Sequence, residues 1–186
     1  MNIKNKDYYF VFCLAGLGSR FKEADFKTPK YLLDYKPNQS TIIEEIISAF
    51  KFSKGAKVKF FCNKRDENYK IVMQKSLSKL KLDFELRYIN DTCGQAETAN
   101  IATEHIKKNN LEFYSTKPII FFNGDTILKS RNIEELVNIL NEEAHGVIDC
   151  FDSNKNNYSY VSIDKNNFIT DIKEKIVISN NATSGL

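Results

Sequence analysis

YYFVFCLAGLGSRF, residues 8–21, joins a run of apolar residues to a loop that contains two glycines. The apolar run, Tyr8–Leu14, predicts a buried β-strand. The loop from Gly16 to Arg20 predicts a phosphate site, because glycines let backbone N–H groups approach phosphate oxygens closely. Arg20 and, further along, Lys30 would add positive charge. Since no general base stands out nearby, these residues favour phosphoryl or nucleotidyl transfer, in which positioning and charge neutralisation supply most of the rate.

Apolar runs alternate with segments of helical periodicity up to Gly146. This alternation predicts an α/β fold with a Rossmann-like, doubly wound and mainly parallel sheet, whose sites lie at the carboxyl ends of the strands. After Gly146, short strand-like runs predict a β-rich extension. We expect one domain over residues 1–186, with an α/β half at 1–145 and the β-rich portion at 146–186. The expected strands are Tyr8–Leu14, Val58–Cys62, Phe84–Ile89, Pro118–Phe122, Val147–Phe151, Tyr158–Ile163 and Phe168–Lys173, and the expected helices begin at Thr41, Asp66, Gln95 and Asn132.

The charge balance argues against a nucleic-acid partner, since the 27 basic and 24 acidic residues are interspersed rather than clustered. No apolar run approaches the roughly 18 residues of a membrane span. Residues 1–7 are polar and contain no signal-peptide core. The 4 cysteines form no C-x-x-C pair, which favours reduced thiols. We therefore expect a cytoplasmic protein that binds neither nucleic acid nor membrane.

A second candidate site is Asn123-Gly124-Asp125, directly after the apolar run Pro118–Phe122. A carboxylate at the end of a strand suits Mg²⁺, which prefers oxygen ligands and leaves room for phosphates. A plain turn, or the cap of a following helix, is an open alternative. A glycosyltransferase D-x-D motif is excluded, because Ile127 stands where the second acid would be.

A third candidate site is the stretch from Thr92 to Ala99, a loop that leads into a helix of small residues. Small side chains would let a base ring approach the start of the helix, where Gln95 could hydrogen-bond the edge of the base. Close packing of the alanines against a sheet is an equally open alternative. Because all three candidate segments follow predicted parallel strands, we expect them to converge at one edge of the sheet.

Other common sites are excluded by single residues. A dinucleotide fingerprint needs a third glycine where Phe21 stands, and a P-loop would need a G-K-[ST] sequence. His105 and His145 are too isolated to build a catalytic triad or a zinc site. A nicotinamide-dependent oxidoreductase is therefore disfavoured.

Taken in order, these segments resemble the nucleotidyltransferase family that makes nucleotide-activated sugars and related compounds. The L-A-G-x-G-x-R-F loop and the P-K pair of that family match Leu14–Phe21 and Pro29-Lys30. Its G-D metal motif matches Gly124-Asp125, and its acceptor-side E-K pair matches Glu174-Lys175. Its strand of small residues leading into G-[LI]-Y matches Ala182–Leu186, so the resemblance spans essentially the whole chain.

The resemblance implies an enzyme that transfers a nucleotidyl group from an NTP to a phosphorylated acceptor, with 1–145 as nucleotide-binding half and 146–186 as acceptor-side portion. Mg²⁺ would bind Asp125, and Arg20 and Lys30 would stabilise the transition state. Lys30 and Lys175 would hold the acceptor phosphate, with Glu174 on another polar group of the acceptor. The implied nucleotide-binding residues are Leu14, Ala15, Gly16, Gly18, Ser19, Arg20, Gly94, Gln95 and Gly124.

The L-A-G-L-G-S-R-F form of the loop is similar to a branch of the family found in capsule and surface-polysaccharide clusters. That branch includes cytidylyltransferase activity on phosphoglutamine, so the resemblance implies CTP as donor and phosphoglutamine or a sugar 1-phosphate as acceptor. The second metal carboxylate of the family comes after the strand at Ala182–Leu186, so we expect the natural chain to continue. A homo-oligomer, and a regulatory module of the same fold that binds nucleotide without turnover, are open alternatives.

Overall fold

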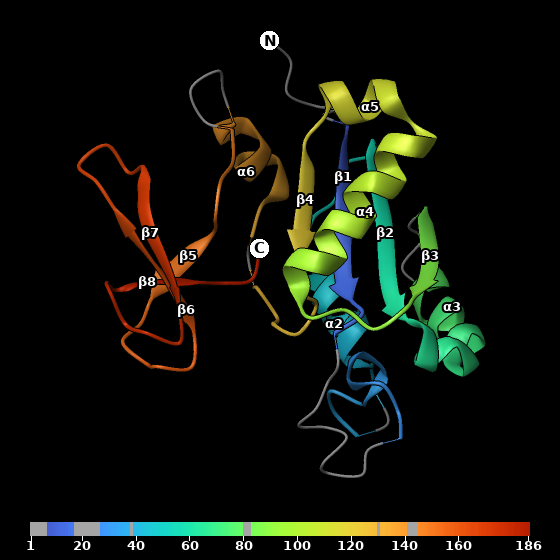
Figure 1. Cartoon of the computed structure of the whole chain (residues 1–186). Coiled ribbons are helices and arrows are strands. Elements are labelled where there is room, and N and C mark those ends of the chain that lie inside the picture. The colour runs from blue at the N-terminus through green and yellow to red at the C-terminus, as the bar shows by residue number, and fades with distance from the viewer. Residues whose placement is uncertain (1–6, 17–26, 38, 80–82, 130, 141–144) are drawn as a thin grey trace. The chain divides into compact units, whose positions relative to one another are not determined.

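The structure is a computed structural model that describes residues 7–16, 27–37, 39–79, 83–129, 131–140 and 145–186. The chain forms two compact units, Met1–Asn138 and Ile139–Leu186, and each is described by itself (Figure 1). The elements up to the start of the second unit are β1 (Tyr8–Leu14), the 3₁₀ helix η1 (Lys30–Leu32), α2 (Ile42–Ala49), β2 (Ala56–Asn63), the 3₁₀ helix η2 (Lys64–Tyr69), α3 (Lys70–Ser78), β3 (Phe84–Ile89), α4 (Gln95–Asn109), α5 (Leu111–Thr116), β4 (Ile119–Phe122) and α6 (Ile133–Ile139).

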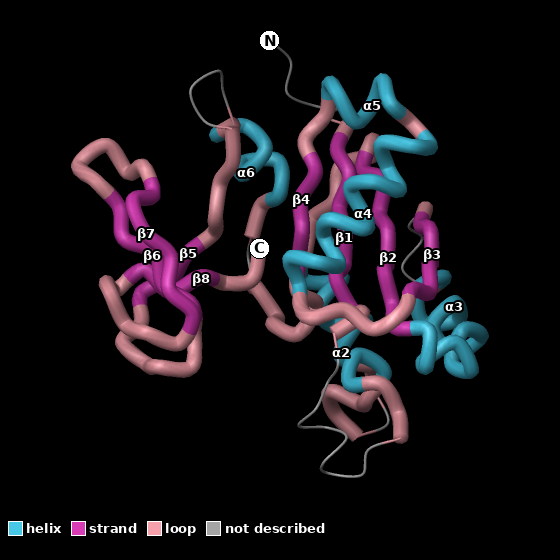
Figure 2. Tube along the Cα trace, in the orientation of Figure 1, coloured by secondary structure: helices cyan, strands magenta, loops and turns pink. Residues whose placement is uncertain are grey.

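The first unit is built on a four-stranded parallel sheet in the order β3-β2-β1-β4 (Figure 2). In the β1–β2 register Phe12 pairs with Phe60, and in the β1–β4 register Phe12 pairs with Phe122. All four strands run in one direction, so their carboxyl ends lie along the same edge of the sheet. The predicted α/β fold with a mainly parallel sheet is confirmed, and β1 has the predicted bounds.

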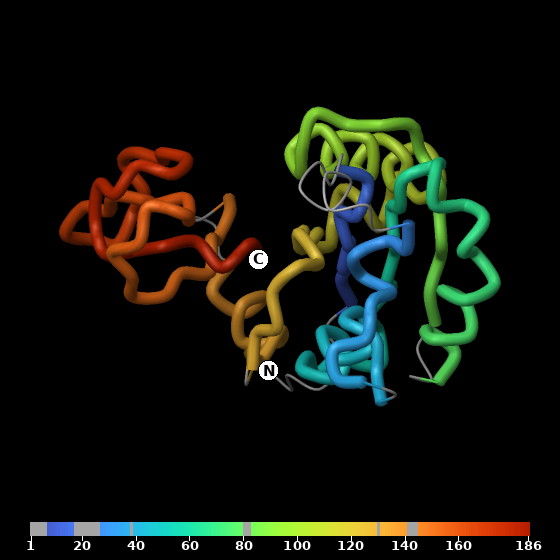
Figure 3. Tube along the Cα trace, turned by 90° about the horizontal axis from the view of Figure 1, so that it is seen from below, coloured from blue at the N-terminus to red at the C-terminus, as the bar shows by residue number. Residues whose placement is uncertain are grey.

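Side chains of β1 alternate between two buried faces of the sheet. Phe10 meets Phe50, the residue that ends α2, with ring centroids 5.2 Å apart. Phe12 stacks on Phe60 with centroids 4.6 Å apart. The odd-numbered residues of β1 lie in a cluster with α4, made of Tyr9, Val11, Cys13, Phe61, Ala102 and Ile106. Helices therefore cover both faces, as a doubly wound sheet requires, with α2 and α4 on opposite sides (Figure 3).

Helix α2 begins with the capping box that the sequence predicts. The backbone N–H of Glu44 donates to Thr41 Oγ1 at 3.4 Å, and the backbone N–H of Thr41 donates to Glu44 Oε2 at 2.8 Å. Two of the four unpaired N–H groups at the helix start are thereby satisfied.

The segment after β2 differs from the prediction of one helix from Asp66 to about Leu80. The 3₁₀ helix η2 comes first and α3 begins only at Lys70. A 3₁₀ helix has three residues per turn, so the apolar pattern changes phase between the two helices. Met73 and Leu77 are buried as expected, whereas Val72, expected on the same face, is 50% exposed.

Two further differences concern the segment before Asn123-Gly124-Asp125. Helix α5 has no counterpart among the expected helices, and Asn110 caps it by accepting the backbone N–H of Phe113 at 3.0 Å. Strand β4 was expected to be buried on both faces, but only Phe122 is buried, and the three residues before it are half-buried.

The second unit is an antiparallel sheet in the order β5-β8-β6-β7. Its strands are β5 (Cys150–Asp152), β6 (Ser159–Ile163), β7 (Ile169–Glu174) and β8 (Asn181–Thr183). Tyr160, Val161 and Ala182 form its buried centre, whereas every residue of β7 is exposed. The predicted β-rich extension is confirmed. Among the described helices of the whole chain, none has the length and apolar character that crossing a membrane requires.

Candidate functional site

The described residues of the three segments singled out in the sequence lie at the carboxyl edge of the parallel sheet. Ala15, just after β1, is buried, and Gly16 follows it on the surface. Gly16 forms a parallel β-bridge with Thr92. Thr92 is itself fixed by a hydrogen bond of 2.8 Å between its hydroxyl and that of Thr98 in α4. The loop after β3 therefore lies directly beside the start of the glycine loop.

Gly94 and Gln95 sit where that loop enters α4. Gln95 is the first residue of the helix and is exposed, and Gly94 precedes it. The carbonyl oxygen of Gly94 accepts the backbone N–H of Thr98 at 3.2 Å. Because the loop that carries Thr92 leads into it, α4 begins at the same edge of the sheet as Gly16.

The turn after β4 needs a glycine. Gly124 has φ of +69°, and a Cβ placed on it would lie 2.2 Å from Leu14 Cδ2. A side chain at this position would meet both an unfavourable backbone conformation and the end of β1. Gly124 thus lets the turn pass close to Leu14 and carries the next residue, Asp125, to the surface.

Asp125 forms an ion pair with Lys30, which is far away in the sequence. Lys30 Nζ lies 3.3 Å from Asp125 Oδ2, and the two side chains are 38% and 47% exposed. Thr126 Oγ1 donates to the other oxygen, Asp125 Oδ1, at 3.1 Å. Lys30 is the first residue of η1, directly after the buried Pro29. The P-K pair and the G-D pair therefore meet in one place, with a cation and an anion facing solvent.

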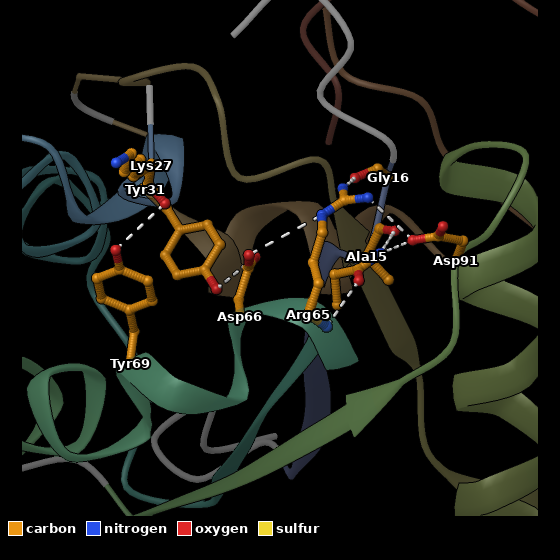
Figure 4. A network of polar contacts seen from close by, with 9 residues as sticks. Ala15, Gly16, Lys27, Tyr31, Arg65, Asp66, Tyr69 and Asp91 are labelled. Atoms are coloured by element: carbon orange, nitrogen blue, oxygen red, sulfur yellow. Dashed lines mark hydrogen bonds and ion pairs between the residues drawn. The ribbon is translucent and has the colours of Figure 1, made fainter. Parts of the chain in front are cut away.

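A polar network on the β2 side of the site was not anticipated from the sequence (Figure 4). Asn63, only 2% exposed, donates to the carbonyl of Ala15 at 2.8 Å and to Asp91 Oδ1 at 2.6 Å. Arg65 donates through Nη1 to Asp91 Oδ1 at 3.0 Å and through Nη2 to the carbonyl of Gly16 at 2.8 Å. The one available signal was a polar residue, Asn63, ending an apolar strand.

The 3₁₀ helix η2, which carries Arg65, also contacts the segment that carries Lys30. Tyr31 Oη donates to Asp66 Oδ2 at 3.1 Å, and Tyr69 Oη donates to the carbonyl of Lys27 at 3.2 Å (Figure 4). The Tyr31 side chain is 6% exposed, and this burial raises the pKa of its hydroxyl. Tyr31 is therefore a neutral hydrogen-bond donor to Asp66.

Comparison with known proteins identifies the fold. A scan against models of protein families and a search of curated proteins find no match. Among solved structures, the chain is similar to a nucleoside-diphosphate-sugar pyrophosphorylase from Vibrio cholerae RC9, with a TM-score of 0.70 and 22% identity, covering 95% of this chain and 70% of that one. It is also similar to a candidate glucose-1-phosphate thymidylyltransferase from Bacillus anthracis in complex with a sucrose, with a TM-score of 0.68 and 16% identity, covering 97% of this chain and 69% of that one. The chain has a nucleotidyltransferase fold.

Not all of the residues predicted for substrate binding can be placed in this nucleotidyltransferase fold. Gly18, Ser19 and Arg20 lie outside the described residues. Glu174 and Lys175 belong to the second unit, where Lys175 Nζ lies 3.0 Å from Glu174 Oε1. Lys175 follows the end of β7 and has a φ of 57°, in the left-handed region.

The described residues contain no metal centre built from protein side chains alone. Within these residues, no group of three or more His, Cys, Asp or Glu side chains could hold a metal ion. Mg²⁺ does not need such a cage, because it commonly binds one or two carboxylates and completes its shell with water and substrate phosphates. The exposed carboxylate of Asp125 next to Lys30 fits that mode of binding.

Proposed function

We propose that this protein transfers a nucleoside monophosphate from an NTP to the phosphate group of a small molecule and releases pyrophosphate. The observation that carries the proposal is the Lys30–Asp125 pair at 3.3 Å, directly after Gly124, which packs against the end of β1. A phosphate-binding cation beside a potential Mg²⁺ ligand, at the carboxyl edge of a parallel sheet, is the arrangement that phosphate-transfer chemistry needs.

The NTP would lie along the edge between β1 and α4. The base would approach Ala15, Gly16 and Gln95, and the triphosphate would extend along Gly18, Ser19 and Arg20. Leu14, Gly94 and Gly124 would shape the surrounding turns. The bridge between Gly16 and Thr92 supports this assignment, because it holds the two backbone segments side by side.

Asp125 would hold Mg²⁺ through its carboxylate. The bound ion would neutralise charge on the phosphate oxygens and orient the pyrophosphate leaving group. Thr126 donates to Asp125 Oδ1, which fixes the orientation of the carboxylate. A hydrogen bond that orients a ligating group in this way is a common part of metal sites.

In the reaction itself, an oxygen of the acceptor phosphate attacks the α-phosphorus of the NTP. A new P–O bond forms to the acceptor, the bond to the α,β-bridging oxygen breaks, and pyrophosphate leaves with that electron pair. The acceptor phosphate is already ionised at neutral pH, so no general base is required. Lys30 and Arg20 would neutralise the charge that gathers on the phosphoryl oxygens.

For the substrates we propose CTP as donor and either phosphoglutamine or a sugar 1-phosphate as acceptor, in the biosynthesis of a capsule or surface polysaccharide. The form of the loop at Leu14–Phe21 supports this choice. The names of both structural neighbours, which refer to nucleotide-sugar chemistry, support a sugar 1-phosphate as acceptor. In either case Lys30, Lys175 and Glu174 would contact the acceptor.

The test is a pyrophosphate-release screen that crosses four NTPs with sugar 1-phosphates and phosphorylated amino acids, with Mg²⁺ and with a chelator. We expect release that depends on one NTP, one acceptor and the metal. Nucleotide binding without release for any pair would favour the regulatory module instead. The absence of both binding and release would overturn the proposal.

A further inference from the structure

One short helix, η2, contacts the described residues on both sides of the segment 17–26. Arg65 Nη2 donates to the carbonyl of Gly16 at 2.8 Å, on the amino-terminal side of that segment. Tyr69 Oη donates to the carbonyl of Lys27 at 3.2 Å, on its carboxyl-terminal side. A helix of six residues therefore contacts the residues on both sides of the segment 17–26.

Within η2, neighbouring charges connect these two contacts. Arg65 Nε lies 4.0 Å from Asp66 Oδ1, and the other oxygen, Asp66 Oδ2, accepts the hydroxyl of Tyr31 at 3.1 Å. Tyr31 is the residue next to Lys30, whose ammonium group pairs with Asp125. A chain of polar contacts therefore leads from Gly16 through Arg65 and Asp66 to Tyr31, the residue that follows Lys30 in the sequence (Figure 4).

We propose that Arg65 and Asp66 are positioning residues that set Gly16 and Lys30 relative to each other for nucleotide binding and transfer. This inference rests on the proposed nucleotidyl-transfer function. Neither residue needs to touch substrate, because Arg65 acts through the carbonyl of Gly16 and Asp66 acts through Tyr31.

The chemistry of the guanidinium group supports this role for Arg65. Its planar guanidinium donates to two acceptors, Gly16 and Asp91, while Nε lies 4.0 Å from Asp66 Oδ1. Lysine carries the same charge on a single nitrogen, so it cannot reproduce two fixed, diverging hydrogen bonds. The Arg65 side chain is 30% exposed, which limits the competition of water for these contacts.

Asn63 and Asp91 hold the fork in place. The backbone N–H of Arg65 donates to Asn63 Oδ1 at 3.1 Å, and Asp91 Oδ1 accepts from both Asn63 and Arg65. Arg65 is therefore held both through its backbone N–H and through its guanidinium group. Because the Arg65 side chain is already ordered before the nucleotide binds, little further conformational freedom is lost there on binding, which favours affinity.

The experiment compares Arg65→Ala and Arg65→Lys with Lys64→Ala in steady-state kinetics and in thermal unfolding. Lys64 is the exposed neighbour of Arg65 on η2, so it controls for a change of charge in the same helix. We expect KM for the NTP to rise about tenfold in Arg65→Ala and to stay raised in Arg65→Lys, since one lost charge-assisted hydrogen bond corresponds to about that factor. Lys64→Ala should leave KM within twofold.

KM separates positioning from a merely structural role, because a smaller folded fraction lowers the apparent kcat but leaves KM unchanged. A second variant, Tyr31→Phe, removes only the hydroxyl that donates to Asp66. Since this contact supports Lys30, we expect a several-fold loss of kcat with little change in KM for the NTP. Unchanged KM in Arg65→Ala, or a loss of Tm without a change in either constant, would overturn the inference.

Hydrogen–deuterium exchange of the backbone amides at 14–16 gives a readout that does not depend on activity. Faster exchange at these amides in Arg65→Ala than in Lys64→Ala is expected, because the Gly16 carbonyl loses its guanidinium donor. If the wild-type protein is inactive but Arg65→Ala still exchanges faster than Lys64→Ala, the nucleotidyl-transfer function would be overturned and Arg65 would remain only a support for the loop. An active wild-type protein with identical exchange and KM in both variants would overturn only the positioning role.

Discussion

The two sides of the carboxyl end of β1 are built in different ways. Toward β2, the amide of Asn63 and the guanidinium of Arg65 join Ala15, Gly16 and Asp91 through hydrogen bonds of 2.6 to 3.0 Å. Toward β4, an ion pair joins Lys30 to Asp125 at 3.3 Å.

The two sides also differ in their exposure to water. Asn63 is 2% exposed, whereas the side chains of Lys30 and Asp125 are 38% and 47% exposed. Removing one partner of a buried hydrogen bond costs about 1–3 kcal/mol, while an exposed ion pair contributes about 0–1 kcal/mol. The β2 side is therefore suited to hold the backbone in position, and the β4 side offers charges that a ligand can reach.

The largest expected effect is on turnover in Asp125→Asn. Loss of a carboxylate that holds the metal should lower kcat by about 100-fold or more, comparable to the loss of one preorganised charge-stabilising group. The free energy of unfolding should change by less than about 1 kcal/mol, because the pair with Lys30 is exposed. Pyrophosphate release and urea unfolding would measure the two quantities.

The matched control for this variant is Asp83→Asn, which neutralises another exposed aspartate of the first unit. It should leave both turnover and stability unchanged. Near-normal turnover in Asp125→Asn would remove Asp125 from the catalytic role.

The free energy of unfolding should fall more in Asn63→Ala than in Lys30→Ala. Asn63→Ala leaves the carbonyl of Ala15 without its side-chain donor in a buried position, so we expect a loss of about 1–3 kcal/mol. Lys30→Ala should cost about 1 kcal/mol or less while reducing turnover. Denaturant unfolding of both variants, with Asn90→Ala as an exposed asparagine control, measures the difference. Equal losses in the two variants would contradict the contrast between the two sides.

Gly124→Ala tests how closely the two sides approach each other. The added Cβ would meet Leu14 Cδ2, and alanine is disfavoured at a φ of +69°, so we expect a loss of about 1–2 kcal/mol. Turnover should fall as well, because Asp125 is the next residue. Gly146→Ala is the control, since a Cβ there has no neighbour within 4 Å. A Tm unchanged from wild type would show that the turn adapts without cost.

The smallest effect concerns cysteine labelling on the loop beside Gly16. Burial raises the pKa of Cys13 and of Cys62 to about 12, so their thiols stay protonated at neutral pH, whereas Cys93 is exposed. Burial also raises the pKa of Cys150. We therefore expect iodoacetamide to modify Cys93 first, and NTP with Mg²⁺ to slow this modification several-fold. Mass spectrometry of the labelled peptides measures both effects, with Cys93→Ser as control. Modification of another cysteine before Cys93, or modification of Cys93 at the same rate with and without NTP and Mg²⁺, would contradict the prediction.

Much of the fold was predictable because local signals agree with the tertiary structure. The apolar run of β1 gives the observed strand with the observed bounds, and Thr41 and Glu44 form the expected capping box. The prediction for Val72 was wrong because this residue lies about 100° around α3 from the buried Met73, at the edge of the apolar face.

The candidate site was only partly predictable. The order of the motifs led to Lys30 and Asp125, and parallel strands bring their segments to one edge. The network of Asn63, Arg65 and Asp91 could not be predicted, because it depends on β2 lying between β1 and β3. A sequence does not state which strands are neighbours, and side-chain contacts across strands follow from that order.

The central claim, that an NTP binds where the glycine loop leaves β1, is tested most directly by NMR titration of ¹⁵N-labelled protein with CTP and Mg²⁺. The account predicts that the largest amide shifts occur at Ala15, Gly16 and Gln95 and at Asp125, with smaller shifts elsewhere in the first unit. Shifts confined to other parts of the chain, or no shift with any of the four NTPs, would contradict it.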